Sequence, residues 1–591
     1  MISKIQQIKL IFSKIQKVFN KHPVLYLSIV LILSVVACYA NVVNAPFIFD
    51  DEATIIGNPL VKNLEHWKTI FSSGFVGEAL YGYSFYRPIQ ILSHAVEYAL
   101  FNENPLGYHF VSIFLHAANA VLLFVLLLKF KINRIWAYGV SQIFAVHAVN
   151  STSVSFISAR GDLLGLLFSL TCFILFISAS KKTWLYPFSA IALTLALISK
   201  ENMVPLPIII AAYVFLFQKK ALRNWVQFTW LGVLNFITIA YSLFRIYYAK
   251  TDTSELLMWV PSIYERLMTV PKIFISYLKL LLVPYPLHVD YYFVDSSWTS
   301  PYIWLGLPLV LIIFVGLYVI SNQKKKFLFY LLWLVIGLAP VYNIAVPLGA
   351  TMRENWLYLP GIGFLLLLAL MYQQFWDDIS RKKKKGLMIL LKIIPILFIL
   401  CLAVLSIVRT VDWTDPIRFF EHEVKYEPDS YVAMNNLAVL YMRAGETGRA
   451  KEILQSAIEK IPKKYAYDAH TNLGIVYSKE KKWEYAEYHL LQAINDSNHE
   501  DAYAQLGRVY FLQERYNEAE ETLSQGYQQY PNNTEILYNY ASYYILVDDF
   551  NNALLMFRKL EDLYPNFGNT REYLTSLSEI VEDQKAIEQV E

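Results

Sequence analysis

The first 408 residues contain a series of apolar runs, each about 16 to 24 residues long, separated by short charged clusters. A helix of about 20 apolar residues is long enough to cross the hydrocarbon core of a bilayer. The runs lie near residues 24–43, 107–130, 134–150, 161–180, 184–199, 204–218, 225–248, 302–320, 327–346, 356–374 and 387–408. They predict an all-α polytopic membrane protein with about eleven spans and exclude an ordinary soluble enzyme.

Charge divides the chain at the end of the last apolar run. Residues up to 408 carry 33 Lys and Arg against 17 Asp and Glu, whereas the remaining residues carry 18 against 31. The second part therefore predicts a water-soluble acidic domain. All three cysteines lie in apolar runs, so this domain can build neither a disulfide framework nor a thiolate metal site. The basic residues of the first part lie at helix ends, which gives no indication of nucleic-acid binding.

The basic clusters also predict the topology. With residues 1–22 as a basic cytoplasmic tail, 21 of the 33 basic residues fall on the cytoplasmic side and 15 of the 17 acidic residues on the other side. The first span is predicted to be an uncleaved anchor. Because the number of spans is odd, everything after residue 408 is predicted to lie outside the cytoplasm, in a periplasm, at an outer face or in an ER lumen. Residues 88–101 and 264–289 are predicted to be interfacial or re-entrant helices on the outer face.

The acidic part contains an internal repeat with a spacing of 33 to 36 residues. Short similar triplets occur at 436–438, 472–474, 505–507 and 539–541, and alanines recur at 450, 486, 519 and 553. This pattern resembles the tetratricopeptide repeat, in which small residues let two helices pack closely and stacked pairs share a core. We expect a linker at 409–425 and a repeat solenoid at 426–591. Its concave groove is predicted to bind a polypeptide, and its net charge of −13 favours a basic partner; a spacer or assembly surface is the alternative.

Three consecutive carboxylates, Asp50, Asp51 and Glu52, follow the first span and fall in the first predicted outer loop. Their mutual repulsion should raise the pKa of at least one of them unless a cation neutralises the cluster. Such a group suits a general base or a metal ligand. The alternative is a solvated loop that happens to be acidic.

More charged residues are predicted at the same outer face, each at the end of a helix. They are Arg87, Arg160, Asp162, Lys200, Glu201, Arg353 and Glu354. Arg and Lys pair well with phosphate while carboxylates can act on an acceptor, so the set predicts a site for an anionic lipid headgroup. Taken singly, each pair could instead stabilise the bundle. His109 and His147 are predicted to support the site, by packing or hydrogen bonding rather than by binding a metal.

A series of motifs occurs in a fixed order before the repeats. They read FIFDDEATIIGNPLV at 47–61, FYRP at 85–88, a histidine-bearing second span, AVHAVNSTSVSFISARGDLLG at 145–165, SKEN at 199–202, ERLMTVPKIFISYLKLLLVPYPLHVDYY at 265–292, RENWLYLPGIGF at 353–364 and VRTVDWTD at 408–415. This order resembles the transmembrane and tetratricopeptide repeat-containing proteins. Those proteins resemble GT-C glycosyltransferases, multispan enzymes that transfer a sugar from a polyprenyl-phosphate carrier to a protein hydroxyl. The resemblance implies a GT-C-like catalytic domain at 23–408.

The resemblance also implies roles for individual residues. Asp50 and Asp51 match the acidic pair that is expected to carry catalysis. Arg160 and Asp162 match the arginine and aspartate of the family's Gly-Arg-Ala-Asp stretch. Lys200 and Glu201 match its Lys-Glu pair, and Arg353 and Glu354 match its later Arg and Glu region. Three positions depart from the family pattern. The expected His-Pro is His147-Ala148, an expected glutamate is Thr152, and an expected asparagine is Ser112.

By this similarity, we expect an inverting transfer of a mannose-like hexose from a polyprenyl-phosphate donor to Ser or Thr hydroxyls of proteins. Asp50 would be the base, and Asp51 would orient the acceptor or hold a metal. Arg353, Lys200 and Arg160 would stabilise the leaving phosphate. A divalent metal is left open, with Asp50 and Asp51 as its ligands if one binds. Two other functions are a non-catalytic membrane scaffold that recruits envelope proteins and a GT-C-type enzyme that modifies polysaccharide or lipid.

Overall fold

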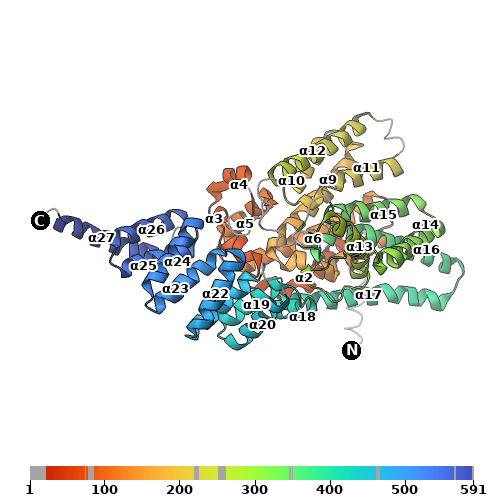
Figure 1. Cartoon of the computed structure of the whole chain (residues 1–591). Helices are drawn as coiled ribbons and strands as arrows, with labels where there is room; N and C mark the ends of the chain where they lie inside the picture. Colours follow the sequence, from red (N-terminus) through yellow and green to blue (C-terminus); the bar gives the residue numbers. More distant parts are fainter. Residues whose placement is uncertain are drawn as a thin grey trace, which may run out of the picture. The chain divides into compact units, whose positions relative to one another are not determined.

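The computed structural model describes residues 22–73, 75–76, 85–218, 225–249, 261–344, 348, 350–460, 466–564 and 567–588. These residues are almost entirely helical and form two compact units, Met1–His422 and Glu423–Glu591 (Figure 1). The predicted all-α class is therefore confirmed. Residues 1–21 of the predicted cytoplasmic tail lie outside the described residues.

The first unit is a bundle of long helices joined by short turns. Its main helices are α2 (Pro23–Tyr39), α5 (Pro88–Phe101), α6 (Pro105–Lys129), α7 (Arg134–Val146), α9 (Arg160–Ala179), α10 (Leu185–Leu197), α11 (Leu206–Phe217), α12 (Trp225–Ala249), α13 (Ile263–Leu282), α14 (Leu307–Ile320), α15 (Lys324–Leu338), α16 (Gly361–Arg381) and α17 (Lys385–Asp412). Shorter helices are α3 (Pro59–Lys62), α4 (Trp67–Ser73) and α8 (Ser151–Ser155). Two small antiparallel sheets pair β1 (Phe75–Val76) with β2 (Phe85–Tyr86) and β3 (Asp290–Tyr291) with β4 (Met352–Arg353).

Each of the eleven predicted spans contains one of these helices. Among the described residues, six helical segments are long and apolar enough to cross a membrane. They are Pro23–Asn44, Pro105–Lys129, Ile157–Ala179, Trp225–Tyr247, Tyr302–Ile320 and Lys385–Asp412. The remaining predicted spans are shorter or more polar helices, so the positions of the helices agree with the sequence while the number of crossings stays a prediction.

The helices begin where the sequence supplies caps. Asn104 accepts a hydrogen bond from the backbone N–H of Leu106 and is followed by Pro105 at the start of α6. Ser262 and Glu265 form a capping box at the start of α13. These caps explain why the two segments predicted at the outer face, α5 and α13, are separate helices rather than extensions of their neighbours.

The core of the first unit lies where α9 packs between α6 and α10. Other surfaces stay strongly apolar, and none of the described residues covers them; Ile312 of α14, for example, is 68% exposed. Exposed aliphatic side chains of this density need a lipid environment. The first unit therefore has the surface of a membrane protein.

The second unit is a stack of antiparallel helix pairs (Figure 1). Its helices are α19 (Tyr431–Arg443), α20 (Thr447–Lys460), α21 (Tyr467–Lys479), α22 (Trp483–Ser497), α23 (Glu500–Leu512), α24 (Tyr516–Gln529), α25 (Thr534–Leu546), α26 (Phe550–Leu563) and α27 (Thr570–Glu588). The segment predicted as a linker, 409–425, holds the end of α17 and most of α18 (Pro416–Tyr426).

Small residues allow the close packing that the repeat pattern predicts. A Cβ atom added at Gly474 would lie 2.5 Å from Cγ of Leu490, and one added at Gly507 would lie 2.5 Å from Cγ of Leu523. The recurring alanines at 450, 486, 519 and 553 are completely buried. The predicted helical-pair repeat is therefore confirmed in the geometry of this unit.

Candidate active site

The loop that carries the acidic cluster is held in an unusual backbone conformation. Phe49, the residue before Asp50, has φ 60, a left-handed value that costs a non-glycine residue roughly 1–2 kcal/mol. Its ring packs on Phe156, with 5.9 Å between ring centroids, and on Phe420, with 6.0 Å. This packing holds the bend that starts the helical turn at Asp50 and Asp51.

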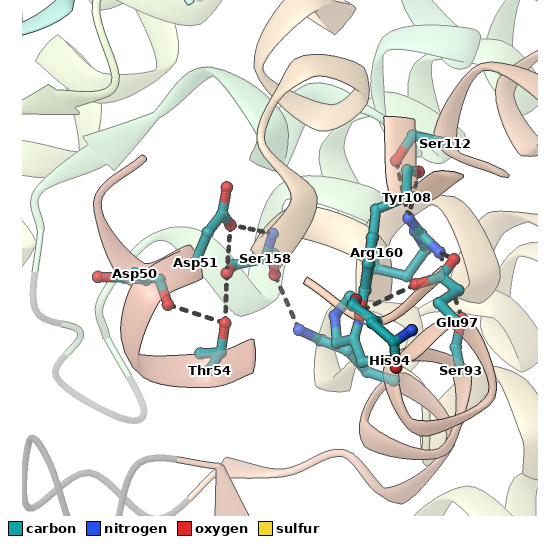
Figure 2. Close-up of polar contacts among 12 residues, drawn as sticks. Asp50, Asp51, Thr54, Ser93, His94, Glu97, Tyr108, Ser112, Ser158 and Arg160 are labelled. Atoms are coloured by element: carbon teal, nitrogen blue, oxygen red, sulfur yellow. Dashed lines mark hydrogen bonds and ion pairs between the residues drawn. The ribbon is translucent and has the colours of Figure 1, made fainter. Parts of the chain in front are cut away.

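Asp51 is directed into the protein and is only 1% exposed. Its Oδ1 lies 2.7 Å from the backbone N of Ser158 and 2.6 Å from Ser158 Oγ, and its Oδ2 accepts from the backbone N–H of Ile48 at 3.4 Å. Figure 2 shows this carboxyl group pointing at Ser158, just before the start of α9. Both of its oxygens are therefore engaged by the protein itself.

Asp50 is half-buried, and its carboxylate lies on the other side of the turn from Ser158 (Figure 2). Within the part of the chain that the structure describes, no donor forms a hydrogen bond with this carboxylate. Arg353, Asp290 and Arg87 are close enough to act on its charge. Of the two aspartates, Asp50 is therefore the one whose carboxylate is not engaged by the described residues.

Burial sets the pKa of both carboxyl groups. It raises the pKa of Asp50 to about 6, although Arg353 and Arg87 oppose the rise. It raises the pKa of Asp51 to about 7, against the opposing hydrogen bonds from Ser158 and Ile48. Asp50 is consequently ionised at neutral pH while keeping a pKa high enough for a general base.

Arg353 is paired with Asp290 across the small sheet of β3 and β4, where the two residues are direct partners in the register. The distance between Arg353 Nε and Asp290 Oδ1 is 2.5 Å, and the arginine side chain is 27% exposed. Asp290 was not among the residues predicted for the site. Asp290 belongs to the segment HVDYY that follows α13. It meets Arg353 only because β3 pairs with β4, and no local sequence pattern indicates that these two strands pair.

Two further ion pairs join predicted site residues at neighbouring helix ends, but in other combinations than the pairs that are adjacent in the sequence. Arg87 donates two hydrogen bonds to Glu201, from Nε at 3.0 Å and from Nη2 at 2.5 Å. Lys200 Nζ lies 2.5 Å from Asp162 Oδ2, with both side chains at most 5% exposed. Asn355 completes this second pair by donating to Asp162 at 2.7 Å.

Arg160 is completely buried and uses its donors within the protein. It donates from Nη1 to Glu97, and from Nη2 to the carbonyl of Tyr108 at 2.8 Å and to Ser112 Oγ at 3.0 Å (Figure 2). Glu97 also contacts Nδ1 of His94 at 3.1 Å. Glu97 was missed because it lies in α5, a segment that the sequence placed at the membrane interface.

The remaining predicted residues are Glu52, Glu354, His109 and His147. Glu354 is fully buried and accepts from Thr152 Oγ1 at 2.7 Å, whereas Glu52 is exposed. His109 lies 3.2 Å from the carbonyl of Ala45, and His147 lies 3.2 Å from the carbonyl of Leu281. These contacts give both histidines backbone partners.

The donor set around the acidic cluster does not fit a divalent metal. Among the described residues, no group of three His, Cys, Asp or Glu side chains could hold a metal ion. Both oxygens of Asp51 already contact protein donors.

The comparisons with known proteins match both parts of the chain. Models of the tetratricopeptide repeat match residues 432–461 and 500–543. The chain is 28% identical to the protein O-mannosyl-transferase F38B6.6 of Caenorhabditis elegans over 361 residues, covering 59% of this chain and 51% of the relative. It is 24% identical to the human protein O-mannosyl-transferase TMTC3 over 625 residues, covering 89% of this chain and 67% of the relative.

The chain thus spans about half the length of the nematode relative that it matches. A solved structure titled as the functional characterization of Pseudomonas aeruginosa pilF matches 28% of this chain and 75% of its own, with 18% identity and a TM-score of 0.25. The relatives that match most of this chain are protein O-mannosyl-transferases of the TMTC family, so the resemblance seen in the motifs is confirmed.

Proposed function

We propose that this relative of the TMTC-family protein O-mannosyl-transferases transfers a mannose-like hexose from a polyprenyl-phosphate carrier to Ser or Thr hydroxyls of proteins. The observation that carries the proposal is the carboxylate of Asp50. It is half-buried, has a pKa of about 6 and accepts no hydrogen bond from the described residues. A general base needs this combination, because it must be ionised and must keep a lone pair for the proton it accepts.

The reaction follows from that arrangement. Asp50 takes the proton of the acceptor hydroxyl as the hydroxyl oxygen attacks the anomeric carbon of the donor. The bond between that carbon and the carrier phosphate oxygen breaks on the opposite face, which inverts the configuration. The phosphate leaves with the electron pair as a stable anion, so no second carboxyl group is needed as an acid.

Arg353 is the cation best placed to stabilise the leaving phosphate. It is partly exposed and acts on the charge of Asp50, so it faces the same space as the base. Arg87 also acts on Asp50 and is 15% exposed in its pair with Glu201. Positive groups fixed where negative charge develops can lower a barrier by several kcal/mol.

Lys200 and Arg160 take a different role in this proposal from the one that the sequence suggested. Both are almost completely buried, and each is matched by a carboxylate, Asp162 for Lys200 and Glu97 for Arg160. Removing one partner of such a pair leaves an uncompensated charge in the interior. We assign these pairs to holding the helix ends that carry the site.

The repeat unit is assigned to the acceptor. Tetratricopeptide repeats indicate a protein-binding surface, and tethering an acceptor beside the site raises its local concentration without any new contact at the reacting atoms. The charge pattern of the loops predicts that both the acidic cluster and the repeats lie outside the cytoplasm. The site and its acceptor would then lie on one side of the membrane.

The test compares intact masses of envelope and secreted proteins from cells that carry the wild-type chain or Asp50→Asn at matched expression. Loss of a hexose-sized adduct from Ser/Thr-rich peptides in Asp50→Asn supports the proposal. Asp377→Asn is the matched control, because it makes the same substitution at an exposed residue near the end of α16. Unchanged adducts in Asp50→Asn would refute protein glycosylation by this residue and favour a scaffold or an enzyme acting on polysaccharide.

A further inference from the structure

Three oxygen contacts join the acidic turn to the segment that precedes α9. Ser158 Oγ lies 2.6 Å from Asp51 Oδ1 and 2.6 Å from Thr54 Oγ1. Thr54 Oγ1 in turn lies 2.8 Å from the backbone carbonyl oxygen of Asp50 (Figure 2). We propose that Ser158 and Thr54 are positioning residues that bind Asp51 and the Asp50 backbone into one chain and so fix the direction of the Asp50 carboxylate. This inference rests on the proposed function of Asp50 as the base.

Ser158 is suited to this role because its own position is fixed from two sides. Its carbonyl accepts from Gln90 Nε2 of α5 at 2.8 Å. Two residues later, Arg160 is anchored to Glu97, to the Tyr108 carbonyl and to Ser112. Ser158 therefore belongs to a buried network of hydrogen bonds that involves several helices.

Thr54 links the network to the residue that does the chemistry. Its hydroxyl contacts the carbonyl of Asp50, so the contact acts on the backbone from which the base projects. The Asp50 carboxylate accepts no hydrogen bond from the described residues, while the residue after it, Asp51, is held inward. One aspartate is thus restrained so that its neighbour can face the substrate.

A count of the hydrogens in these contacts indicates which of the two aspartates is protonated. Three short contacts between oxygens need three hydrogens, whereas the hydroxyls of Ser158 and Thr54 supply two. With Asp51 ionised, Ser158 donates to it, and the Thr54 hydroxyl can donate either to Ser158 or to the Asp50 carbonyl, so one of these two contacts has no hydrogen. With Asp51 neutral, every contact has one, and the chain runs from Asp51 through Ser158 and Thr54 to the carbonyl.

The neutral form also agrees with the environment of Asp51. Burial raises its pKa to about 7, and the charge of Asp50 acts in the same direction. Between pH 6 and pH 7, Asp50 is mostly ionised while Asp51 is mostly neutral. The negative charge of the pair then resides on Asp50, the group that needs it.

The experiment measures mannosyl transfer by the purified full chain from polyprenyl-phosphate mannose to a Ser/Thr peptide that loses its hexose in the cellular test. Thr54→Val and Ser158→Ala should each lower kcat about 10- to 100-fold, because small displacements of a reacting group cost that much. The KM for the donor should stay within about twofold, since both residues are proposed to act through the position of Asp50. Thr54→Ser keeps the hydroxyl and should recover most of the wild-type rate.

Thr171→Val is the matched control. Thr171 also donates its hydroxyl to a carbonyl four residues earlier, that of Leu167 at 2.8 Å, but it lies farther along α9. Its loss should leave kcat near the wild-type value. Equal losses of kcat in Thr54→Val and Thr54→Ser, or in Thr54→Val and Thr171→Val, would show that the hydroxyl chain is not what matters and would overturn the inference.

The pH profile separates positioning from a direct role. The hydrogen bonds from Ser158 lower the pKa of Asp51, so Ser158→Ala would move the acidic limb of kcat to higher pH if Asp51 were the base. With Asp50 as the base, the midpoint of the acidic limb of the kcat–pH profile stays unchanged in Ser158→Ala, while the maximal kcat falls. A shift of that midpoint would overturn the inference. A wild-type chain that transfers no mannose would refute the proposed function, whereas active wild type with unaffected variants would refute only the positioning role.

Discussion

Mannosyl transfer by this chain should decline as the pH falls through about 6, because Asp50 must be ionised to accept the hydroxyl proton. Burial raises the pKa of this carboxyl group from 3.8 to about 6. At pH 7 about nine in ten carboxyl groups are then ionised, and at pH 5 about one in ten, so the rate at pH 5 should be about tenfold below its plateau. An aspartate with its ordinary pKa would leave the rate almost unchanged over the same interval.

Arg353→Gln should move this decline in rate, the acidic limb of the pH profile, to higher pH. Arg353 is the group that most strongly favours the ionised form of Asp50, and its removal also frees the negative charge of Asp290, which disfavours that form. Both changes raise the pKa of Asp50. Arg353→Lys keeps the positive charge and should leave the limb closer to its wild-type position.

The assay is the initial rate at saturating donor between pH 4.5 and 8, with each sample returned to pH 7 afterwards to confirm that activity is recovered. The donor phosphodiester stays ionised throughout, so the limb reports the protein. Arg353→Gln will also lower the plateau if it stabilises the leaving phosphate, but the midpoint is read from the shape of the curve. A rate that stays flat down to pH 4.5, or an Arg353→Gln limb at the wild-type position, would refute the reasoning.

Three other predictions concern the framework of the site and the repeats. Glu97→Gln leaves the guanidinium of Arg160 buried without its carboxylate and should destabilise the chain by about 3–5 kcal/mol, measured as a lower thermal unfolding midpoint. Gly161→Ala places a methyl group 2.8 Å from the carbonyl oxygen of Ser199 and should lower turnover by displacing the start of α9. Deleting residues 427–591 should reduce glycosylation of intact proteins more than transfer to a short peptide, and both are measured by mass spectrometry.

Each of these predictions has a control or a contrary outcome. Asp378→Asn breaks an exposed pair with Arg381 and should change stability by less than about 1 kcal/mol. Gly139→Ala adds a methyl group where nothing lies within 4 Å and should leave turnover unchanged. Equal effects of Glu97→Gln and Asp378→Asn, or of the two glycine variants, would contradict the roles assigned here. Equal losses on protein and peptide after the deletion would argue against an acceptor-binding groove.

The helices could be predicted from the sequence because their signals are local. Apolar runs, capping residues such as Asn104 and the repeated small residues at Gly474 and Gly507 each act within one helix or one helix pair. All eleven predicted spans contain a helix for this reason. The number of membrane crossings is a different matter, because short helices such as α7 and α10 have 13 residues each and length alone does not place them.

The site was predicted as a set of charges, but the sequence could not show which charges are free. The pairings of Arg160 with Glu97 and of Arg353 with Asp290 join residues 63 apart in sequence, and no spacing rule connects them. The roles of Ser158 and Thr54 were missed because a serine two residues before an arginine looks like ordinary helix-start chemistry. Their function depends on a contact across 104 residues, which only the fold reveals.

The most direct test of the account is to compare two neighbouring substitutions, Asp50→Asn and Asp51→Asn, in the purified full chain with polyprenyl-phosphate mannose and a Ser/Thr peptide. With Asp50 as the base, Asp50→Asn should lower kcat about 10²- to 10⁴-fold, as expected for loss of a general base. Asp51→Asn, which keeps an uncharged hydrogen-bonding side chain of the same shape, should lose much less. A larger loss in Asp51→Asn, or near-normal turnover in Asp50→Asn, would contradict the assignment of Asp50 as the base.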